Sequence, residues 1–333
     1  MNLREKLEKY YFEGNYNCAE SLLRAANDHY GLGITDTDMI MAAGFGAGIQ
    51  TGSTCGAVLA AVSVLSLLYV KEKAHESTDI KPKVNMFIQL FTEKVRSTTM
   101  CRDIRPLMFC PESRCLLTVQ AACDALEETV REPIISVDVM RRSDAWTIEN
   151  QIPSKELMRR AGQAIFNAAE WKAPVAVVCG KGNNAGDGYV AAALMKDAGI
   201  DCSVILISDD FSEDGKYYYE KCLEKGVKVE KYSPETDFGK YGSVLDCLLG
   251  TGFRGEVRGT MKDVIGKIND SGAYVVSADI NSGLNGDTGE GSIYVDSDLT
   301  VSIGYYKYGH FTGESGKAMK AKVNADIGIR LIR

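Results

Sequence analysis

Three short stretches in the second half of this 333-residue sequence place chemically useful side chains directly after apolar runs. The first is a glycine-rich run from Cys179 to Gly188, which follows the apolar residues 173–178 and precedes a helix-like run. Glycines let backbone amides approach a phosphate, and the N-terminus of a helix favours negative charge. This stretch therefore predicts a nucleotide pocket.

An aspartate opens each of the other two stretches. Asp246 precedes a glycine-rich turn that ends near Glu256, and Asp279 precedes a second turn that ends near Gly289. Ligands of parallel sheets bind beyond the carboxyl ends of the strands, so we expect all three loops to converge on one crevice. The plainer alternatives are an ordinary turn after Asp246 and an Asx-turn at Asp279 that only stabilises its own bend.

The first loop also fits a different class of enzyme. The spacing Gly180-x-Gly182-x-x-Ala185 matches the relaxed dinucleotide fingerprint, so an NAD-dependent oxidoreductase is an alternative. In that case Asp209 or Asp210, after the next strand, would bind a ribose. The two asparagines inside the run argue against it, because the fingerprint needs little side-chain chemistry there.

The spacing of apolar residues predicts an α/β fold for this part of the chain. Strand and helix patterns alternate, which is typical of βαβ units in a three-layer αβα Rossmann-like sandwich with a mostly parallel sheet. The predicted strands are residues 175–179, 202–207, 227–232, 243–248, 274–279 and 299–303, and the predicted helices are residues 135–149, 153–170, 188–198, 213–225 and 260–271.

In the first part of the chain, the spacing of apolar residues predicts helices and no strands, and Pro133 indicates a domain boundary. We expect an all-α cysteine-containing domain at residues 1–131 and the α/β domain at residues 132–333. A flexible segment, residues 44–54, would bring Cys55 to a helix start, where the helix dipole lowers the pKa of a thiol. The predicted helices are residues 3–12, 18–30, 36–43, 55–73, 81–96 and 115–130.

Composition and charge limit the partners. The chain has 38 Lys and Arg against 45 Asp and Glu, a net charge of −7, which argues against nucleic acid and anionic membranes. No apolar run has the length of a membrane span, and the charged amphipathic start lacks a signal-peptide core. We therefore expect a cytoplasmic protein whose ten cysteines are thiols, metal ligands or redox pairs, not structural disulfides.

Residues 8–129 resemble the family of redox-active proteins named for four cysteines and a C-G-A-x-x-G signature. The matching stretches are Asn17-Cys18-Ala19, residues 44–48, Cys55-Gly56-Ala57-Val58-Leu59, Cys101-Arg102 and Cys115-Leu116-Leu117. Ala60 departs from the signature, since it stands where the last glycine is expected. The resemblance implies a redox role for Cys18, Cys55, Cys101 and Cys115, with Cys110 and Cys123 as extras.

The chemistry of these four thiols stays open at this point. No C-x-x-C pair occurs, so the spacing supports neither a zinc ribbon nor a thioredoxin-type motif. Iron or another metal is one alternative, a disulfide is a second, and a structural role is a third, because free cysteine often packs as a small apolar residue. Cys55 is the first candidate for a reactive thiol.

Residues 135–330 resemble the NAD(P)H-hydrate epimerase family, whose pattern is G-x-G-N-N-G-G-D-G, D-x-x-x-G-T-G and D-I-P-S-G-L with a later D-T-G. The three loops carry this pattern in order, but Ala185 stands for a glycine and Asn281 for the proline. Ala185 would add a methyl group beside the nucleotide, and Asn281 would free the backbone at the bend that aims Asp279 and Ser282. Further matches are Leu157-Met158-Arg159-Arg160-Ala161-Gly162 and Lys307-Tyr308-Gly309.

The resemblance implies interconversion of the R and S forms of hydrated NADH and NADPH, which carry a hydroxyl on the reduced nicotinamide ring. It also implies a dinucleotide site and a potassium site of oxygen donors. The dinucleotide residues would be Asn183, Asn184, Ala185, Gly186, Asp187, Gly250, Thr251, Gly252, Phe253, Arg254, Gly255 and Glu256. The potassium ligands would be Asn184, Asp246 and Ser282.

Asp279 is the candidate catalytic residue. Inverting a carbon that bears both a hydroxyl and the ring nitrogen requires loss and return of the hydroxyl, or opening and closing of the ring. Either route needs one group that gives and takes a proton. We expect a carboxylate in a partly dry crevice to have its pKa raised toward that task.

Further expectations concern partners. The chain stops at Arg333, too early for the ATP- or ADP-dependent NAD(P)H-hydrate dehydratase that would complete the repair, so we expect that enzyme as a separate polypeptide. We also expect a homodimer. The main alternative from another class is a non-catalytic sensor, in which the thiols report redox state and the second domain detects a pyridine nucleotide.

Overall fold

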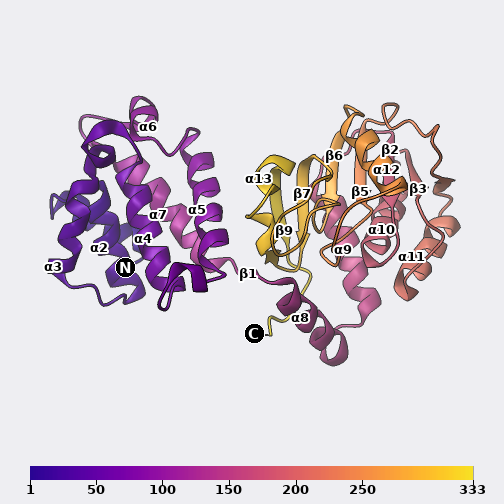
Figure 1. Ribbon diagram of the computed structural model, residues 1–333, viewed down its shortest axis with the longest axis horizontal. Coiled ribbons are helices and arrows are strands. Elements are labelled where there is room, and N and C mark those ends of the chain that lie inside the picture. The colour runs from indigo at the N-terminus through magenta and orange to yellow at the C-terminus, as the bar shows by residue number, and fades with distance from the viewer. Residues whose placement is uncertain (333) are drawn as a thin grey trace. The chain divides into compact units, whose positions relative to one another are not determined.

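The computed structural model describes residues 1–332, which divide into two compact units (Figure 1). The first unit is residues 1–133, and the second begins at Ile134. Each unit has a hydrophobic core of its own. Among the described residues, no helix combines the length and the apolar character that crossing a membrane requires.

The first unit is a bundle of helices. Its α-helices are α1 (Leu3–Phe12), α2 (Cys18–Tyr30), α3 (Asp36–Met39), α4 (Gly56–Tyr69), α5 (Ile80–Val95), α6 (Cys101–Met108) and α7 (Leu116–Arg131). The predicted bounds of α1 and α2 are confirmed, and α4, α5 and α7 lie within four residues of theirs. Helix α6 is not predicted, because its eight residues include Pro106 and give little periodic signal.

Residues 44–54 are not the flexible segment that the glycines suggest. A 3-10 helix (Ile40–Phe45) leads into a wound turn, Gly48–Gly52. Ala47, Gly48, Ile49 and Gln50 in sequence all have positive φ, between 52° and 62°. This left-handed conformation costs a residue other than glycine roughly 1–2 kcal/mol. The turn therefore stores backbone strain.

The second unit is built on a seven-stranded sheet. Its strands are β2 (Val175–Cys179), β3 (Cys202–Leu206), β4 (Lys228–Lys231), β5 (Ser243–Cys247), β6 (Tyr274–Ala278), β7 (Ser297–Ile303) and β9 (Met319–Ala325). The order is β4-β3-β2-β5-β6-β7-β9 and every neighbouring pair is parallel. The six predicted strands are confirmed within two residues, whereas β9 is an additional edge strand.

Helices cover both faces of this sheet, as Figure 1 shows. They are α8 (Val137–Asn150), α9 (Ser154–Ala168), α10 (Asn183–Asp197), α11 (Glu213–Glu224), α12 (Thr260–Asn269) and the short α13 (Ser315–Ala318). Val175 and Val177 pack with α9 and α10, and the alternate residues Ala176 and Val178 pack with α12. The predicted three-layer αβα sandwich is therefore confirmed.

The sheet has its switch point between β2 and β5. The chain runs outward from β2 to β3 and β4, then returns to β5 and continues outward on the other side. Ligands of open parallel sheets bind where the strand order reverses, beyond the carboxyl ends of the strands. The loops after β2 and β5 are the first two of the three loops predicted from the sequence.

A second, two-stranded sheet lies beside the main one. It pairs β1 (Ile134–Ile135) with β8 (Tyr306–Lys307) in parallel register, Ile134 with Tyr306 and Ile135 with Lys307. Strands of two residues carry no sequence period, so neither is predicted. This small sheet fixes the backbone of Lys307.

Candidate active site

The structure brings the three predicted loops together at one glycine. A Cβ atom at Gly250 would lie 3.4 Å from the Asn184 Cβ and 3.4 Å from the Asp279 Oδ2. A residue of the second loop therefore separates the first loop from the third, and any side chain at this position would occupy the space between them. A similar close approach occurs at Gly180, where a Cβ would lie 2.1 Å from the carbonyl oxygen of Leu248.

The first loop is shorter than predicted, because α10 begins at Asn183 and not at Gly188. The predicted nucleotide residues 183–186 thus form the first turn of a helix, where backbone N–H groups have no partner within the helix. Gly182 precedes this turn with φ 103°. The methyl group of Ala185 belongs to the hydrophobic core beneath the helix, so it does not project into the crevice as expected.

Asp279 is held in an unusual conformation directly after β6. Its φ of 63° is left-handed, which places strain on a residue other than glycine. One carboxylate oxygen, Oδ1, accepts a hydrogen bond from Lys307 Nζ at 2.6 Å. The other, Oδ2, accepts from the backbone N–H of Thr251 at 3.1 Å and from its hydroxyl at 2.8 Å. The carboxylate is thus oriented by groups on two separate segments.

Lys307 reverses the expected direction of the pKa shift at Asp279. Burial acts to raise the pKa of Asp279, but the charge and hydrogen bond of Lys307, with the Thr251 N–H, outweigh it and hold that pKa below its usual value. The sequence-based expectation of a raised pKa is therefore wrong. It failed because the lysine lies 28 residues away in the chain and only the fold makes it a partner.

The ammonium group of Lys307 is fully engaged by the protein. Its side chain is 1% exposed, and Nζ donates to Asp279 Oδ1, to the Ile303 carbonyl at 2.9 Å and to the Ser302 hydroxyl at 3.5 Å. An ammonium has three hydrogens, and each has an acceptor here. Lys307 therefore orients the Asp279 carboxylate, and no hydrogen of its ammonium group remains for another acceptor.

His310 connects the backbones of these two residues. Its Nδ1 accepts from the Lys307 N–H at 3.1 Å, which makes Nε2 the protonated nitrogen that donates to the Asp279 carbonyl at 2.7 Å. Burial, reinforced by the charge of Lys307, lowers the pKa of His310 to about 3. The ring is therefore neutral at ordinary pH and acts as a fixed link.

Two further carboxylates lie near Asp279, and their pKa values shift the other way. Burial and then the charge of Asp279 raise the pKa of Asp144 on α8. Burial, followed by Asp279 and Asp144, raises the pKa of Asp187, just after the first turn of α10, well above its usual value. One carboxylate with a lowered pKa beside two with raised pKa values is an arrangement found in acid–base sites.

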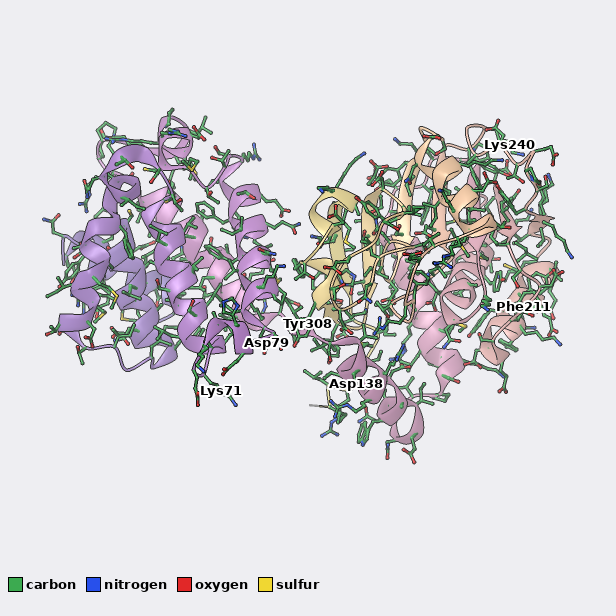
Figure 2. The ribbon with its side chains drawn as sticks, viewed as in Figure 1. Lys71, Asp79, Asp138, Phe211, Lys240 and Tyr308 are labelled. Atoms are coloured by element: carbon green, nitrogen blue, oxygen red, sulfur yellow. The ribbon has the colours of Figure 1, made fainter. Side chains whose placement is uncertain are left out.

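Helix α8 forms part of the site, which the sequence does not indicate. The Val137 N–H at its start donates to Asp287 Oδ1 at 2.7 Å, and Asp287 Oδ2 lies 3.1 Å from Arg254 Nη2 in the second loop. A Cβ at Gly252 would lie 3.6 Å from Arg141 Nη2. Arg141 lies one turn before Asp144, so one helix brings a cation and a carboxylate to the loops (α8 carries the labelled Asp138 in Figure 2).

The other residues of the second loop contact groups within the protein. Thr251 binds Asp279, Phe253 packs against the core on the α12 side of the sheet, and Glu256 pairs with the exposed Arg258 at 2.7 Å. Gly255 has φ 93°. Of the predicted dinucleotide residues in this loop, Gly250, Thr251, Gly252 and Arg254 lie against groups of the other two loops or of α8.

The predicted potassium ligands include a buried carboxylate without a cationic partner. Asp246 accepts hydrogen bonds from the Ser282 hydroxyl at 2.5 Å, the Ser282 N–H at 3.0 Å, the Ser277 hydroxyl at 2.9 Å and the Leu248 N–H at 3.2 Å. Within residues 1–332 no lysine, arginine or histidine pairs with it. Burial raises the pKa of Asp246 despite these bonds.

Asn184 is the unsatisfied member of that set. Its amide nitrogen and oxygen are both buried, and neither has a hydrogen-bond partner among the described residues. Asn184 lies against Gly250. The preceding residue, Leu249, donates its backbone N–H to the Ser282 hydroxyl at 2.9 Å, which connects Asn184 with the rest of the set. A buried polar group without a partner is costly, so this cluster fits a cation that takes oxygen ligands.

Asn281 stands where the family pattern has proline, and its side chain stabilises the bend after Asp279. Its side chain is fully buried. The amide nitrogen donates to the Val295 carbonyl at 2.7 Å, the Ala318 carbonyl at 2.8 Å and the Ser297 hydroxyl at 3.0 Å. The amide oxygen accepts from the Thr300 hydroxyl at 2.5 Å. The expectation of a freer backbone is therefore wrong, because hydrogen bonds replace the constraint of the ring.

The four predicted redox cysteines are all free thiols at helix starts. Cys55 does precede α4, as predicted, but its expected low pKa is wrong. Burial and then the neighbouring Cys18 raise the pKa of Cys55 to about 12. At this site burial outweighs the helix dipole.

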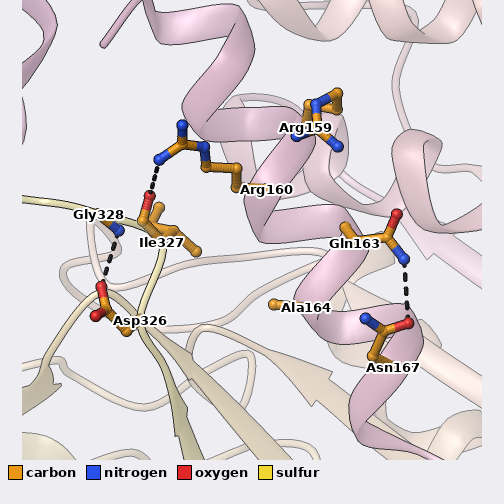
Figure 3. Close-up of a pocket in the computed structure, with 8 residues that line it drawn as sticks. All are labelled: Arg159, Arg160, Gln163, Ala164, Asn167, Asp326, Ile327 and Gly328. Carbon is orange, nitrogen blue, oxygen red and sulfur yellow. Dashed lines mark hydrogen bonds between the residues drawn. The ribbon is translucent and has the colours of Figure 1, made fainter. Parts of the chain in front are cut away.

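A cavity of about 330 Å³ in the second unit is not the candidate site (Figure 3). It lies between α9 and the segment after β9, and its charged groups are paired within the protein. Arg159 and Arg160 both bind Glu156, and Arg160 also donates to the Ile327 carbonyl at 3.1 Å. None of the predicted site residues lines it.

A parallel αβα sandwich whose loops meet at the switch point belongs to the Rossmann-like class. Two family models match the chain. "YjeF-related protein N-terminus" matches residues 154–309, and "Putative redox-active protein (C_GCAxxG_C_C)" matches residues 16–129. Neither match includes α8.

Individual relatives define the family of the second unit. The NAD(P)H-hydrate epimerase of Limosilactobacillus reuteri is 32% identical over 193 residues, 56% of this chain and 91% of that protein. The NAD(P)H-hydrate epimerase of Lentilactobacillus buchneri is 34% identical over 205 residues, 59% of this chain and 94% of that protein. The chain belongs to the NAD(P)H-hydrate epimerase family.

Larger relatives match over a smaller share of their own length. The bifunctional NAD(P)H-hydrate repair enzyme of Thermofilum pendens is 36% identical over 167 residues, 46% of this chain and 32% of that protein. The corresponding enzyme of Coxiella burnetii is 34% identical over 183 residues, 53% of this chain and 37% of that protein. The chain thus spans about a third of the length of these bifunctional relatives.

Proposed function

We propose that the second unit interconverts the R and S epimers of hydrated NADH and NADPH. The observation that carries this proposal is the buried ion pair of Asp279 and Lys307 at the place where the three loops meet. Membership of the epimerase family supports the same reaction. Asp279 is the group we assign to proton transfer.

The charge state of Asp279 favours the ring-opening route. An ionised carboxylate can take a proton at the start of the reaction but cannot give one. In ring opening, Asp279 removes the hydroxyl proton, a carbonyl forms, the C–N bond breaks and its electron pair goes to the ring nitrogen, conjugated with the carboxamide. Attack by that nitrogen on the other face of the carbonyl closes the ring, and Asp279 returns the proton to the oxygen.

The protein groups around Asp279 support this sequence. Lys307 and Thr251 keep the carboxylate ionised and aimed, and Lys307 cannot act as the acid because its three hydrogens are engaged. Burial raises the pKa values of Asp144 and Asp187, and a carboxyl group that is protonated can donate a hydrogen bond to the substrate. We assign them to stabilising the electron-rich opened ring.

The first turn of α10 is our candidate for the pyrophosphate. Its free N–H groups and the helix dipole favour an anion. Arg141 on α8 and Arg254 in the second loop add positive charge beside the second and third loops. The proposed dinucleotide site therefore includes Arg141, in addition to the residues that the family pattern implies.

Asn184, Asp246 and Ser282 are our candidate ligands for K⁺. The unpartnered Asn184 oxygen and the uncompensated Asp246 carboxylate support a bound cation. When bound, K⁺ would supply positive charge beneath the first and third loops. The role that we assign to Asn184, Asp246 and Ser282 is to hold this ion and, with it, the loops.

The discriminating experiment is incubation of the full chain with the separated epimers. Interconversion without change in NADH absorbance supports the epimerase. Binding without interconversion supports a nucleotide sensor, and loss of NADH absorbance supports an oxidoreductase. We further propose that the protein is cytoplasmic and a homodimer, and that a separate ATP- or ADP-dependent dehydratase completes the repair.

A further inference from the structure

Four helices of the first unit begin at a cysteine. Cys18 is the first residue of α2 and Cys101 is the first residue of α6, whereas Cys55 and Cys115 directly precede α4 and α7. The N-terminus of each helix carries partial positive charge and free N–H groups. Each of the four cysteines therefore lies at a helix N-terminus.

Backbone pairing brings three of these cysteines together. The Cys55 N–H donates to the Thr99 carbonyl at 2.8 Å, and the Cys101 N–H donates to the Ser53 carbonyl at 2.7 Å. Cys18 approaches from α2, because a Cβ at Gly56 would lie 2.9 Å from the Cys18 Sγ. The start of α4 thus contacts both other helix starts.

Cys115 completes the group from α7. Its thiol interacts electrostatically with those of Cys18 and Cys101. Its backbone N–H donates to the Tyr11 hydroxyl at 2.8 Å, which fixes the start of the helix. Burial and then Cys101 raise the pKa of Cys115, while the guanidinium groups of Arg105 and Arg114 oppose this shift, so positive charge lies near this sulfur.

Backbone N–H groups of the strained turn and of the helix starts point at two of the sulfur atoms. Cys18 interacts with the N–H groups of Ala47 and Ala19, and Cys55 with those of Ala57 and Val58. The turn also approaches α6, since a Cβ at Gly48 would lie 2.6 Å from the Cys101 Cβ. Hydrogen bonds of this kind stabilise thiolate ligands and tune the potential of the metal they bind.

The spacing of the sulfur atoms distinguishes between kinds of metal centre. Zinc bound by thiolates at about 2.3 Å needs sulfur atoms about 3.8 Å apart. Within residues 1–332, no three of these four sulfur atoms lie within 4.8 Å of one another. The group is therefore too wide for a single tetrahedral ion, and a polynuclear centre fits it better.

We propose that Cys18, Cys55, Cys101 and Cys115 are the four ligands of an iron–sulfur cluster. Soft thiolates select iron–sulfur clusters, and the four helix starts stabilise the negative charge that a thiolate-ligated cluster carries. The site is independent of the proposed epimerase function. It provides the first unit with a defined cofactor class.

The other two cysteines of this unit serve as internal comparisons. The thiol of Cys110 donates to Glu112 Oε2 at 2.6 Å, although its backbone N–H pairs with the Arg114 carbonyl at 3.1 Å, one residue before Cys115. Cys123 lies in the middle of α7, fully buried in the core. Neither takes part in the proposed site.

Anaerobic purification of the full chain tests the proposal. We expect iron and acid-labile sulfide in equal amounts, with a visible absorption band that dithionite bleaches. Cys55→Ser and Cys101→Ser should lose most of the iron and sulfide, whereas Cys110→Ser should retain them. Circular dichroism of each variant reports whether the helices remain folded.

Reconstitution with ferrous iron and sulfide is a second test. It applies when a variant folds poorly or when the protein loses its cluster during purification. In the reconstituted wild type, the four cysteines should resist alkylation while Cys110 reacts. Stoichiometric zinc without sulfide, a Cys18–Cys55 disulfide in anaerobically isolated protein, or absence of iron after reconstitution would each overturn the proposal. Epimerase activity is not used as a readout, so these results stand apart from the proposed function.

Discussion

The ammonium group of Lys307 lies 2.6 Å from the carboxylate of Asp279, and the lysine side chain is 1% exposed. Asp279 directly follows β6, Lys307 is the last residue of β8, and His310 links their backbones. A buried pair of this kind fixes both the orientation and the charge of the carboxylate. Removing either partner leaves the other as an uncompensated buried charge.

Asp279→Asn should reduce epimerisation by about 100-fold or more, the scale of general acid–base catalysis. Asparagine keeps the size of the side chain but cannot carry the proton. The measurement is turnover of the purified R epimer, with binding of NADH as the control for folding. Turnover near that of the wild type would disprove the role of Asp279.

Lys307→Met should move the acid limb of the pH profile upward. In the wild type the pKa of Asp279 is held below its usual value of 3.8, so kcat/KM should stay level down to about that pH. Without the lysine, burial raises this pKa, and activity should fall as the pH drops through a higher range. A purely structural role would lower activity equally at every pH. Lys307→Arg, which keeps the charge, should shift the limb less.

His310 should make the free energy of unfolding depend on pH. Its pKa is lowered to about 3 in the folded protein, so the unfolded chain, with a pKa near 6.5, binds more protons between these values. Its contribution is complete above about pH 6.5 and decreases by up to about 1.4 kcal/mol per pH unit as the pH falls. Denaturant unfolding of the wild type and His310→Gln at several pH values measures the difference. Equal pH dependence in both would contradict the assignment.

Asn184→Ala should abolish a potassium-specific stabilisation while costing little stability in its absence. The Asn184 amide has no hydrogen-bond partner to lose. The wild type should show a higher Tm in KCl than in NaCl at equal ionic strength, and the variant should show the same Tm in both. A potassium effect that survives in the variant would remove Asn184 from the ligand set.

Asn281→Ala is the matched comparison for that variant. Both positions are buried asparagines, but Asn281 makes four hydrogen bonds. We expect a loss of about 2–4 kcal/mol in the free energy of unfolding, because several buried partners become unsatisfied. A change below about 0.5 kcal/mol would show that the bend does not depend on this side chain.

A single turnover in H₂¹⁸O should distinguish the two routes of inversion. Ring opening keeps the original oxygen on carbon during the turnover, whereas loss and return of hydroxide introduces the solvent label. We expect the inverted product to retain ¹⁶O, since Asp279 begins as a base. Full incorporation of label at each inversion would favour the hydroxide route.

The sequence alone predicts the sheet and its loops well, because buried strands and glycine turns leave local patterns. Val175 to Cys179 is an apolar run before glycines, and its strand bounds are confirmed. The edge strand β9 is missed, since Lys320 and Lys322 interrupt the apolar pattern. Local signals therefore identify the core strands better than the periphery.

Partnerships between distant residues could not be predicted in the same way. The pKa directions of Asp279 and Cys55 depend on Lys307 and on burial, which no local pattern encodes. Asp144 and Arg141 look like ordinary exposed helix residues until the fold brings α8 to the loops. The effect of Asn281 was misjudged for the same reason, because its four partners come from later segments of the chain.

The pairing of β1 with β8 has a consequence for shortened forms of this protein. Ile135, two residues after Pro133, is in register with Lys307. A protein that begins at Ser136 would retain every loop of the site but would lack the strand that supports the lysine backbone. One that begins at Glu132 would keep it. The two residues of β1 thus belong to the frame of the candidate active site, although they precede all three of its loops.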